Sequence, residues 1–182
     1  MMKAGDVMTR TRLYARDMQG ERFSDFEVFA AINDAVRLLA EEELRVFSGA
    51  DFRRSCDLDT ATAGYALLPE GFLREIRAFD GVDGNELLRV HSDEPGDGEY
   101  AIREGVLHSG CDKVTLCYYG LPAEVRAPDD DLRLSEKTLP AVAKMAAAML
   151  SGGDAAAVQT ALYFTGQSAE AASSGGEQRD SG

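Results

Sequence analysis

An amphipathic helix predicted over residues 24–47 limits the architectures that this chain can adopt. Ser24 and Glu27 have the S-x-x-E spacing of a capping box, in which the serine side chain accepts a helix N–H and the glutamate reaches back to the serine N–H. Apolar side chains then recur at three- and four-residue steps, at Phe29, Ile32, Val36, Leu39, Ala40 and Leu44. A stripe of this length must be covered by other parts of the chain, so we expect further helices to pack against it.

Three more helices are predicted in the segments that flank the centre of the chain. They span residues 6–17, 138–151 and 154–165, and the last two are rich in alanine, which allows close approach to another helix. Residues 167–182 contain no large apolar residue and are dominated by Ser, Ala, Gly, Glu and Gln, a composition typical of segments that are disordered in isolation. We therefore expect one domain over residues 1–166, followed by a flexible C-terminal tail.

Residues 52–122 change from the helical period to the two-residue period of β-strands. The strongest strand is predicted over residues 113–119, where β-branched and aromatic side chains alternate. Asp83-Gly84 is typical of a hairpin turn, and about five to seven short strands suit a small antiparallel sheet or sandwich. The predicted fold class is α+β: a helical bundle with an inserted small antiparallel β-module at residues 52–122.

Charge is unevenly distributed along the sequence. The net charge is −13, but residues 1–22 sum to +2, so the rest of the chain carries −15. Binding to nucleic-acid phosphates relies on clustered Lys and Arg, which the acidic remainder lacks. The small basic N-terminal patch, which includes Arg10 and Arg12, is instead suited to an acidic protein surface.

The sequence offers few residues for catalysis or metal binding. His91 and His108 are the only histidines, and neither has a second histidine or a cysteine at metal-ligand spacing. A hydrolase that uses either histidine with an acidic partner is an alternative class, but no G-x-S-x-G motif supports it. The run Asp129–Asp131 lacks the spacing of a calcium loop and is expected to be solvated. We therefore expect no catalytic residue, no metal site and no cofactor.

The expected compartment is the cytosol. No stretch approaches the ~18 consecutive apolar residues of a membrane span, and the first residues lack the apolar core of a signal peptide. Cys56, Cys111 and Cys117 are odd in number and have no C-x-x-C spacing, so reduced thiols are expected.

Several segments share a pattern with one known family. Residues 65–74 read YALLPEGFLR, residues 100–107 read YAIREGVL, and residues 114–122 read VTLCYYGLP. These segments resemble the Y-x-L-P-x-D-F-L-R and Y-x-I-x-G-x-x-L … V-x-L-x-Y-Y-x-x-P segments of the head–tail adaptor (connector, or head-completion) proteins of tailed bacteriophages. INDAVRLL at residues 32–39 is similar to the first long helix of that family, and Asp131 and Leu134 match a recurring Asp and Leu. Glu70-Gly71 departs from the pattern, which has an Asp before the Phe.

The resemblance implies a non-enzymatic structural protein of the virion neck, present in the host cytoplasm during assembly. It implies that the monomer assembles into a ring, commonly a dodecamer in that family, beneath the portal protein. A tail or stopper protein is the second implied partner. Double-stranded DNA would pass through the ring without specific binding, and no membrane contact is expected.

The residues expected at interfaces are Arg10, Arg12, Tyr118, Tyr119, Gln167, Gln178 and Arg179. The two arginines belong to the basic patch and the two tyrosines to the face of the β-module. The other three belong to the tail, which in the resembled family commonly becomes ordered on the portal. An alternative function is a small non-enzymatic protein-binding module, tail-associated or directed at a host protein, that uses the β-module face.

Overall fold

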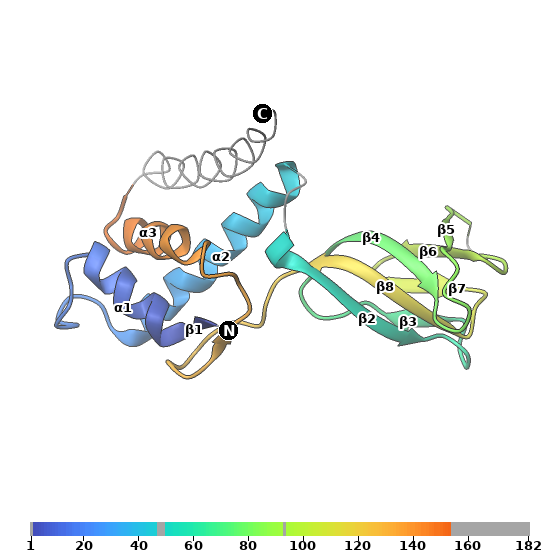
Figure 1. Ribbon diagram of the computed structural model, residues 1–182, viewed down its shortest axis with the longest axis horizontal. Helices are drawn as coiled ribbons and strands as arrows, with labels where there is room; N and C mark the ends of the chain where they lie inside the picture. The colour runs from blue at the N-terminus through green and yellow to red at the C-terminus, as the bar shows by residue number, and fades with distance from the viewer. Residues whose placement is uncertain (1, 47–49, 93, 154–182) are drawn as a thin grey trace, which may run out of the picture. The chain divides into compact units, whose positions relative to one another are not determined.

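The computed structural model describes residues 2–46, 50–92 and 94–153. In chain order the elements are β1 (Met2–Lys3), α1 (Ala4–Tyr14), α2 (Asp25–Val46), the 3-10 turn η1 (Ala50–Phe52), β2 (Arg53–Asp59), β3 (Tyr65–Leu67), β4 (Phe72–Asp80), β5 (Leu88–Arg89), β6 (Glu99–Arg103), β7 (Val106–Ser109), β8 (Lys113–Gly120), β9 (Asp131–Leu132) and α3 (Leu139–Leu150). They divide into two compact units (Figure 1): Met1–Asp51 with Ala123–Gly182, and Phe52–Pro122. We call them the helical unit and the sheet unit.

The helical unit is built around α2, which packs against α3 and against α1. The predicted capping box is confirmed: the Ser24 N–H donates to Glu27 Oε2 at 2.8 Å, and the Glu27 N–H donates to Ser24 Oγ at 3.3 Å. The buried stripe of α2 consists of Val28, Phe29, Ile32, Ala35, Val36, Leu39 and Ala40. Burial of each larger aliphatic side chain stabilises the unit by about 1.5–3 kcal/mol.

Polar contacts fix the chain that returns from the sheet unit to the helices. The Asn33 side-chain amide on α2 donates to the Val125 carbonyl and accepts the Val125 N–H, both at 3.0 Å. Asp51 Oδ2 accepts the Ser135 N–H at 3.1 Å and the Thr138 hydroxyl at 2.9 Å, which holds the segment just before α3. These contacts join residues about 90 positions apart in sequence.

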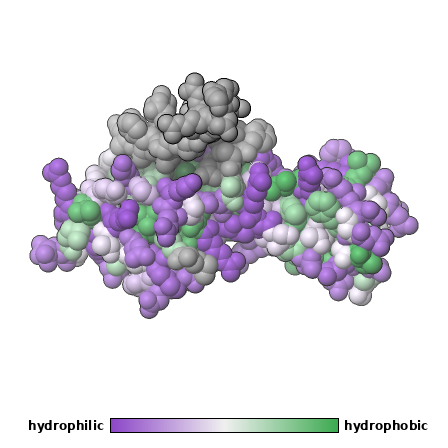
Figure 2. All heavy atoms as spheres, viewed as in Figure 1, coloured by the Kyte–Doolittle hydropathy of each residue, from purple (hydrophilic) through white to green (hydrophobic). Residues whose placement is uncertain are grey.

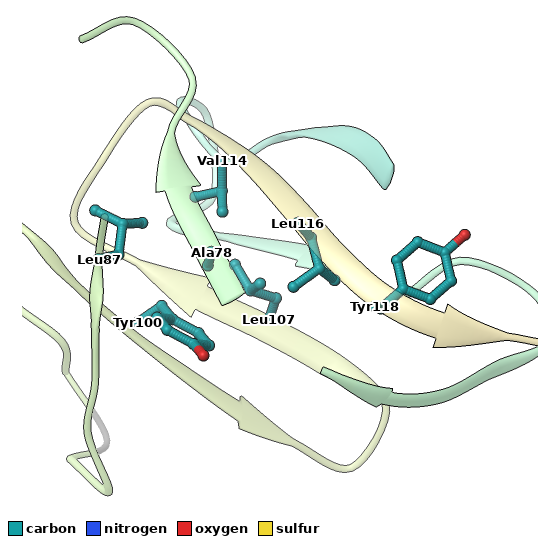
Figure 3. Packing of buried hydrophobic residues seen from close by; sticks show 7 residues of the cluster. All are labelled: Ala78, Leu87, Tyr100, Leu107, Val114, Leu116 and Tyr118. Carbon is teal, nitrogen blue, oxygen red and sulfur yellow. The ribbon is translucent and has the colours of Figure 1, made fainter. Parts of the chain in front are cut away.

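Two sheets face each other in the sheet unit, with strand orders β2-β8-β4 and β3-β7-β6-β5. Their shared core contains Ala78, Leu87, Tyr100, Leu107, Val114, Leu116 and Tyr118. Figure 3 shows these side chains converging from β4, β6, β7 and β8 and from the chain just before β5. The strand predicted at residues 113–119 is β8, the central strand of the first sheet.

The chain after β4 passes from one sheet to the other. The Leu87 N–H donates to the Ala78 carbonyl on β4, and the next N–H, of Leu88, donates to Gly98 beside β6. β5 then runs parallel to β6. The turn at Asp83-Gly84 therefore does not produce the simple antiparallel hairpin that its sequence favours, because the returning strand pairs with β4 only briefly.

The predicted fold class is wrong. The described residues have about as much strand as helix, arranged in three helices and three sheets, so the protein is a mixed α/β structure rather than a helical bundle with a small inserted antiparallel β-module. One strand pair is parallel, and the third sheet, β1-β9, lies in the helical unit, where Met2 pairs with Leu132. The reason is that two-residue strands such as β1 and β9 are too short to show a period in the sequence.

The helices predicted over residues 6–17, 24–47 and 138–151 correspond to α1, α2 and α3, with α1 beginning and ending earlier than predicted. α1 starts at Ala4 because β1 leads directly into it, whereas Asp6 lies in its first turn. The helix predicted over residues 154–165 and the tail at residues 167–182 lie outside the described residues.

Candidate functional site

A buried arginine organises the connection between α1 and α2. Arg12 Nη1 donates to Asp17 Oδ2 at 2.8 Å and to the Phe23 carbonyl at 3.0 Å, and Nη2 donates to Asp25 Oδ1 at 2.6 Å. The side chains of Arg12 and Asp17 are only 10% and 2% exposed. Gly20 adopts a φ of +68°, and a Cβ there would lie 3.3 Å from Arg12 Nη1, so glycine suits both the backbone and the packing.

Asp17 is the acidic partner of Arg12 and also accepts hydrogen bonds from the backbone of the connection between α1 and α2. Burial acts to raise the pKa of Asp17, but its carboxylate accepts backbone N–H groups from Arg22, Phe23 and Glu21 and lies beside Arg12, and together these lower the pKa. The Asp17 carboxylate therefore stays ionised. We call Arg12, Asp17 and Asp25 the Arg12 cluster.

A shallow hollow of about 620 Å³ lies over the Arg12 cluster. It is lined by Met8, Thr9, Arg12, Met18, Gln19, Gly20, Phe23, Ser24 and Asp25. Large apolar side chains are exposed on the same elements, with Leu13 at 57%, Met18 at 56% and Phe26 at 81%. On the face in view in Figure 2, hydrophobic residues form scattered patches within a mainly hydrophilic surface. These side chains are the candidates in the helical unit for contact with another protein, because protein–protein sites are rich in exposed apolar surface.

The outer face of the sheet β2-β8-β4 carries arginine and tyrosine side by side. Tyr119 is paired across the strands with Arg53 on one side and Arg74 on the other. The Arg74 guanidinium lies 5.4 Å from the centre of the Tyr119 ring, the geometry of a cation–π contact. Arg77 lies in the next outward-facing row of this sheet, paired with Cys117.

The described residues among the predicted interface residues are divided between the helical unit and the sheet unit. Arg10 is exposed on α1, whereas Arg12 is held within the Arg12 cluster. Tyr118 belongs to the core of the sheet unit and Tyr119 is 6% exposed on its other face. The remaining three, Gln167, Gln178 and Arg179, lie outside the described residues. A role in an interface stays a prediction for all seven.

Exposed apolar residues are the functional candidates that sequence reasoning missed. Leu13 and Phe26 interrupt polar faces of α1 and α2, so a helical-wheel count could have found them. In the sheet unit, Tyr65 and Leu67 are 48% and 73% exposed on the edge strand β3. Alternation within that short strand gave no indication of which side chains would face solvent.

The described residues contain no arrangement that supports the alternative of a hydrolase. His91 is exposed, and the ring of His108 lies 5.8 Å from the ring of Tyr65, centre to centre, as a packing contact. No three His, Cys, Asp or Glu side chains within the described ranges are placed to hold a metal ion together. Asp130 in the acidic run accepts the Arg126 and Ala127 N–H groups, which shape the loop. None of the described helices has the length and low charge content of a membrane span.

Exposed apolar and charged side chains such as these provide surfaces for contact with other proteins. The family model described as "SU10 adaptor protein" matches residues 2–181, and the chain belongs to this family. Among curated proteins, none matches the chain. The resemblance to the head–tail adaptors of tailed bacteriophages is thereby confirmed, and the protein is a phage structural adaptor, a virion component that interacts with other virion components.

Proposed function

We propose that this adaptor binds the portal ring and extends the DNA channel toward the tail, at the neck between capsid and tail. Membership of an adaptor family over residues 2–181 is the observation that carries the proposal. In this proposal the monomer assembles into a ring on the portal, and the tail or a stopper protein binds the opposite side. The protein works by contact alone and catalyses no reaction.

The charge of the chain supports a channel through which DNA slides. A net charge of −13 on each copy would give a ring a strongly acidic surface, and such a surface repels the phosphates of double-stranded DNA. A basic channel would retain the genome through many phosphate contacts. We therefore expect no measurable DNA binding by the purified protein at physiological salt.

The tail, residues 167–182, is the proposed portal-binding segment. It contains Gln167, Gln178 and Arg179 and no large apolar residue, so it adds little to a folded core in the free protein. A segment that becomes ordered on its partner makes assembly depend on that partner, because the entropy cost of ordering is offset only in the complex.

The test is deletion of residues 167–182, followed by binding to purified portal rings and by negative-stain imaging of the mixture. The truncated protein should lose portal binding and keep its thermal midpoint within about 1 °C, because the tail sequence has no large apolar side chain to add to a core. A control with the tail sequence scrambled, at equal length and charge, should also fail to bind. Unchanged portal affinity in the truncated protein would rule out this role of the tail.

A second candidate function, a protein-binding module that uses the sheet unit, has one observation in its favour. Tyr65 and Leu67 are exposed on the edge strand β3, and an edge strand with exposed apolar side chains is suited to β-augmentation by a partner strand. The double variant Tyr65→Ser and Leu67→Ser separates the two functions. It should retain portal binding if the tail carries that contact, whereas a sheet-based module would lose its partner.

A further inference from the structure

The outer face of the sheet β2-β8-β4 has opposite charges at its two ends. At the end where β2 begins, Arg53 and Arg74 flank Tyr119, and Arg77 lies one outward-facing row further along, opposite Cys117. Directly paired side chains, and side chains two residues apart on one strand, point to the same side of a sheet. The register therefore places three arginines together on the solvent side, and we call them the arginine end.

Carboxylates collect at the opposite end of the same sheet. Asp59 ends β2, and Asp83 and Asp112 lie in the turns that lead out of β4 and into β8, all three exposed. Asp57 is also at this end, but Lys113 Nζ lies 2.9 Å from its Oδ2 and balances its charge. We call Asp59, Asp83 and Asp112 the acidic end. Arg53 and Asp59 are separated by the length of β2, about 20 Å at the usual rise per residue of a strand.

Further carboxylates near the acidic end remain ionised for local reasons. The Val82 and Asp83 N–H groups donate to Asp80 Oδ1, at 2.7 and 3.2 Å, and these hydrogen bonds lower the pKa of Asp80. The side-chain hydrogen bonds from Lys113 and Thr115 lower the pKa of Asp57. These hydrogen bonds favour the charged forms of Asp57 and Asp80, which lie beside the acidic end.

We propose that the arginine end of one copy binds the acidic end of the next copy, as a head-to-tail contact between sheet units. The two ends are complementary in charge but lie on different parts of one molecule, so the contact is heterologous, and a heterologous contact gives a ring when the rotation between neighbouring copies closes. This inference rests on the proposed assembly of the adaptor into a ring and names the surface that neighbouring copies share. The second copy is the favoured occupant because every copy brings an acidic end.

Double-stranded DNA is a poorer occupant of the arginine end. The residues Phe52–Pro122 contain seven basic and thirteen acidic side chains, so a long polyanion that covered this unit would meet a net negative charge. Glu86 Oε1 lies 3.7 Å from Arg77 Nε and offsets part of its charge, but a compact acidic feature on a protein can contact the arginine end without covering the rest of the unit. Electrostatic complementarity of this limited extent suits protein–protein docking.

The test uses two charge-reversal variants of the full chain. The arginine-end variant carries Arg53→Glu and Arg77→Glu, and the acidic-end variant carries Asp83→Lys and Asp112→Lys. All four residues are exposed, so both variants should fold as the wild type does. Self-association is measured by sedimentation velocity at low ionic strength, where the Debye length is about 30 Å at 0.01 M, and then again at high salt.

The wild type should associate at low salt and dissociate at high salt, and each variant alone should associate at least tenfold more weakly. A mixture of the two variants in equal amounts should regain association, because the reversed end of each then faces an end of opposite charge. The acidic-end variant excludes the explanation that association depends only on the net charge of each copy. It is less negative than the wild type, so general repulsion would predict stronger association for it.

The control variant carries Arg37→Glu and Arg126→Glu, which change the net charge as the arginine-end variant does but lie in the helical unit. It should associate like the wild type. A wild type that stays monomeric at low salt and high concentration would overturn the proposal, as would variants that associate normally. Loss of double-stranded DNA binding in the arginine-end variant alone would assign the face to DNA instead. Portal binding by the single variants tests the proposed function separately, because an adaptor can bind the portal without this lateral contact.

Discussion

Arg12 and Asp17, five residues apart, form a buried ion pair with an Nη1–Oδ2 distance of 2.8 Å. The pair spans the end of α1 and the start of the following connection, and Arg12 extends the contact to Asp25 at the first turn of α2. Asp17 also accepts three backbone N–H groups, so side-chain hydrogen bonds hold the connection between α1 and α2. The Arg12–Asp17 pair therefore contributes to the stability of this connection.

Substitution Arg12→Met is expected to lower the thermal midpoint by at least about 5 °C. Removing one partner of a buried ion pair leaves the other charge without compensation, and this costs several times more than losing an exposed pair. Circular dichroism during heating measures the effect. Arg10→Met is the matched control, since Arg10 lies on the same helix and is exposed. Equal midpoints for the two variants would contradict the role given to Arg12.

The contribution of Asp17 to stability is expected to depend on pH. Its folded pKa lies below the ordinary value of 3.8, so the stabilisation is fully present above that value and is lost as the pH falls through the lower, folded pKa. The variant Asp17→Asn should be clearly less stable than the wild type at pH 7, and the difference in thermal midpoint should shrink below pH 3.8. Asp6→Asn, at an exposed carboxylate of α1, serves as the comparison. A difference for Asp17→Asn that is constant from neutral to acidic pH would refute the assignment.

The pair between Asn33 and Val125 should be worth about 2 kcal/mol of unfolding free energy. Val125 is 1% exposed, so Asn33→Ala leaves a buried N–H and a buried carbonyl without their partner. Asn33→Asp keeps the acceptor and loses the donor, and it should show an intermediate loss at high pH. Urea unfolding curves provide the measurement, with the exposed neighbour Asp34→Ala as control. No loss in Asn33→Ala would show that water replaces the amide.

Core packing in the sheet unit gives a further prediction. Leu116 is fully buried between the two sheets, and Leu116→Ala should cost about 2–5 kcal/mol, because the cavity left behind closes only in part. Val82→Ala, at a residue that is 77% exposed, should change the free energy of unfolding by less than about 0.5 kcal/mol. Denaturant titration compares the two variants, and similar losses would mean that the core is not where the structure places it.

Local sequence patterns were sufficient to predict the described helices and β8, the central strand of the sheet β2-β8-β4. The capping box at Ser24 and the stripe that ends in Leu39 predicted α2 within one or two residues, and alternation at Val114 and Leu116 predicted β8. The overall class was not predictable in the same way. Strands of two residues, such as β1 and β9, depend on a partner far away in sequence, and no local period identifies them.

The candidate surfaces were harder to predict than the elements. The arginines near the N-terminus predicted a basic patch that includes Arg12. Asp17 and Asp25 neutralise the charge of Arg12 through ion pairs that the spacing of residues along a helix does not predict. Tyr118 and Tyr119 were both expected on one face of the β-module, but adjacent residues of a strand point to opposite sides of a sheet. Which side faces the core depends on the second sheet, which is why Tyr118 lies inside. The separation of charge between the two ends of the sheet β2-β8-β4 is recognised only from the pairing register of its strands, which sequence alone does not provide.

The first and last strands of the first sheet, β2 and β8, are neighbours, and Arg53 at the start of one pairs with Tyr119 near the end of the other. The chain therefore enters and leaves the sheet unit at almost the same point. An insert with adjacent ends can be removed, lengthened or exchanged by recombination while the host helices keep their spacing. Exchange of the sheet unit among related phages would change what the adaptor contacts and leave the helical unit as it is.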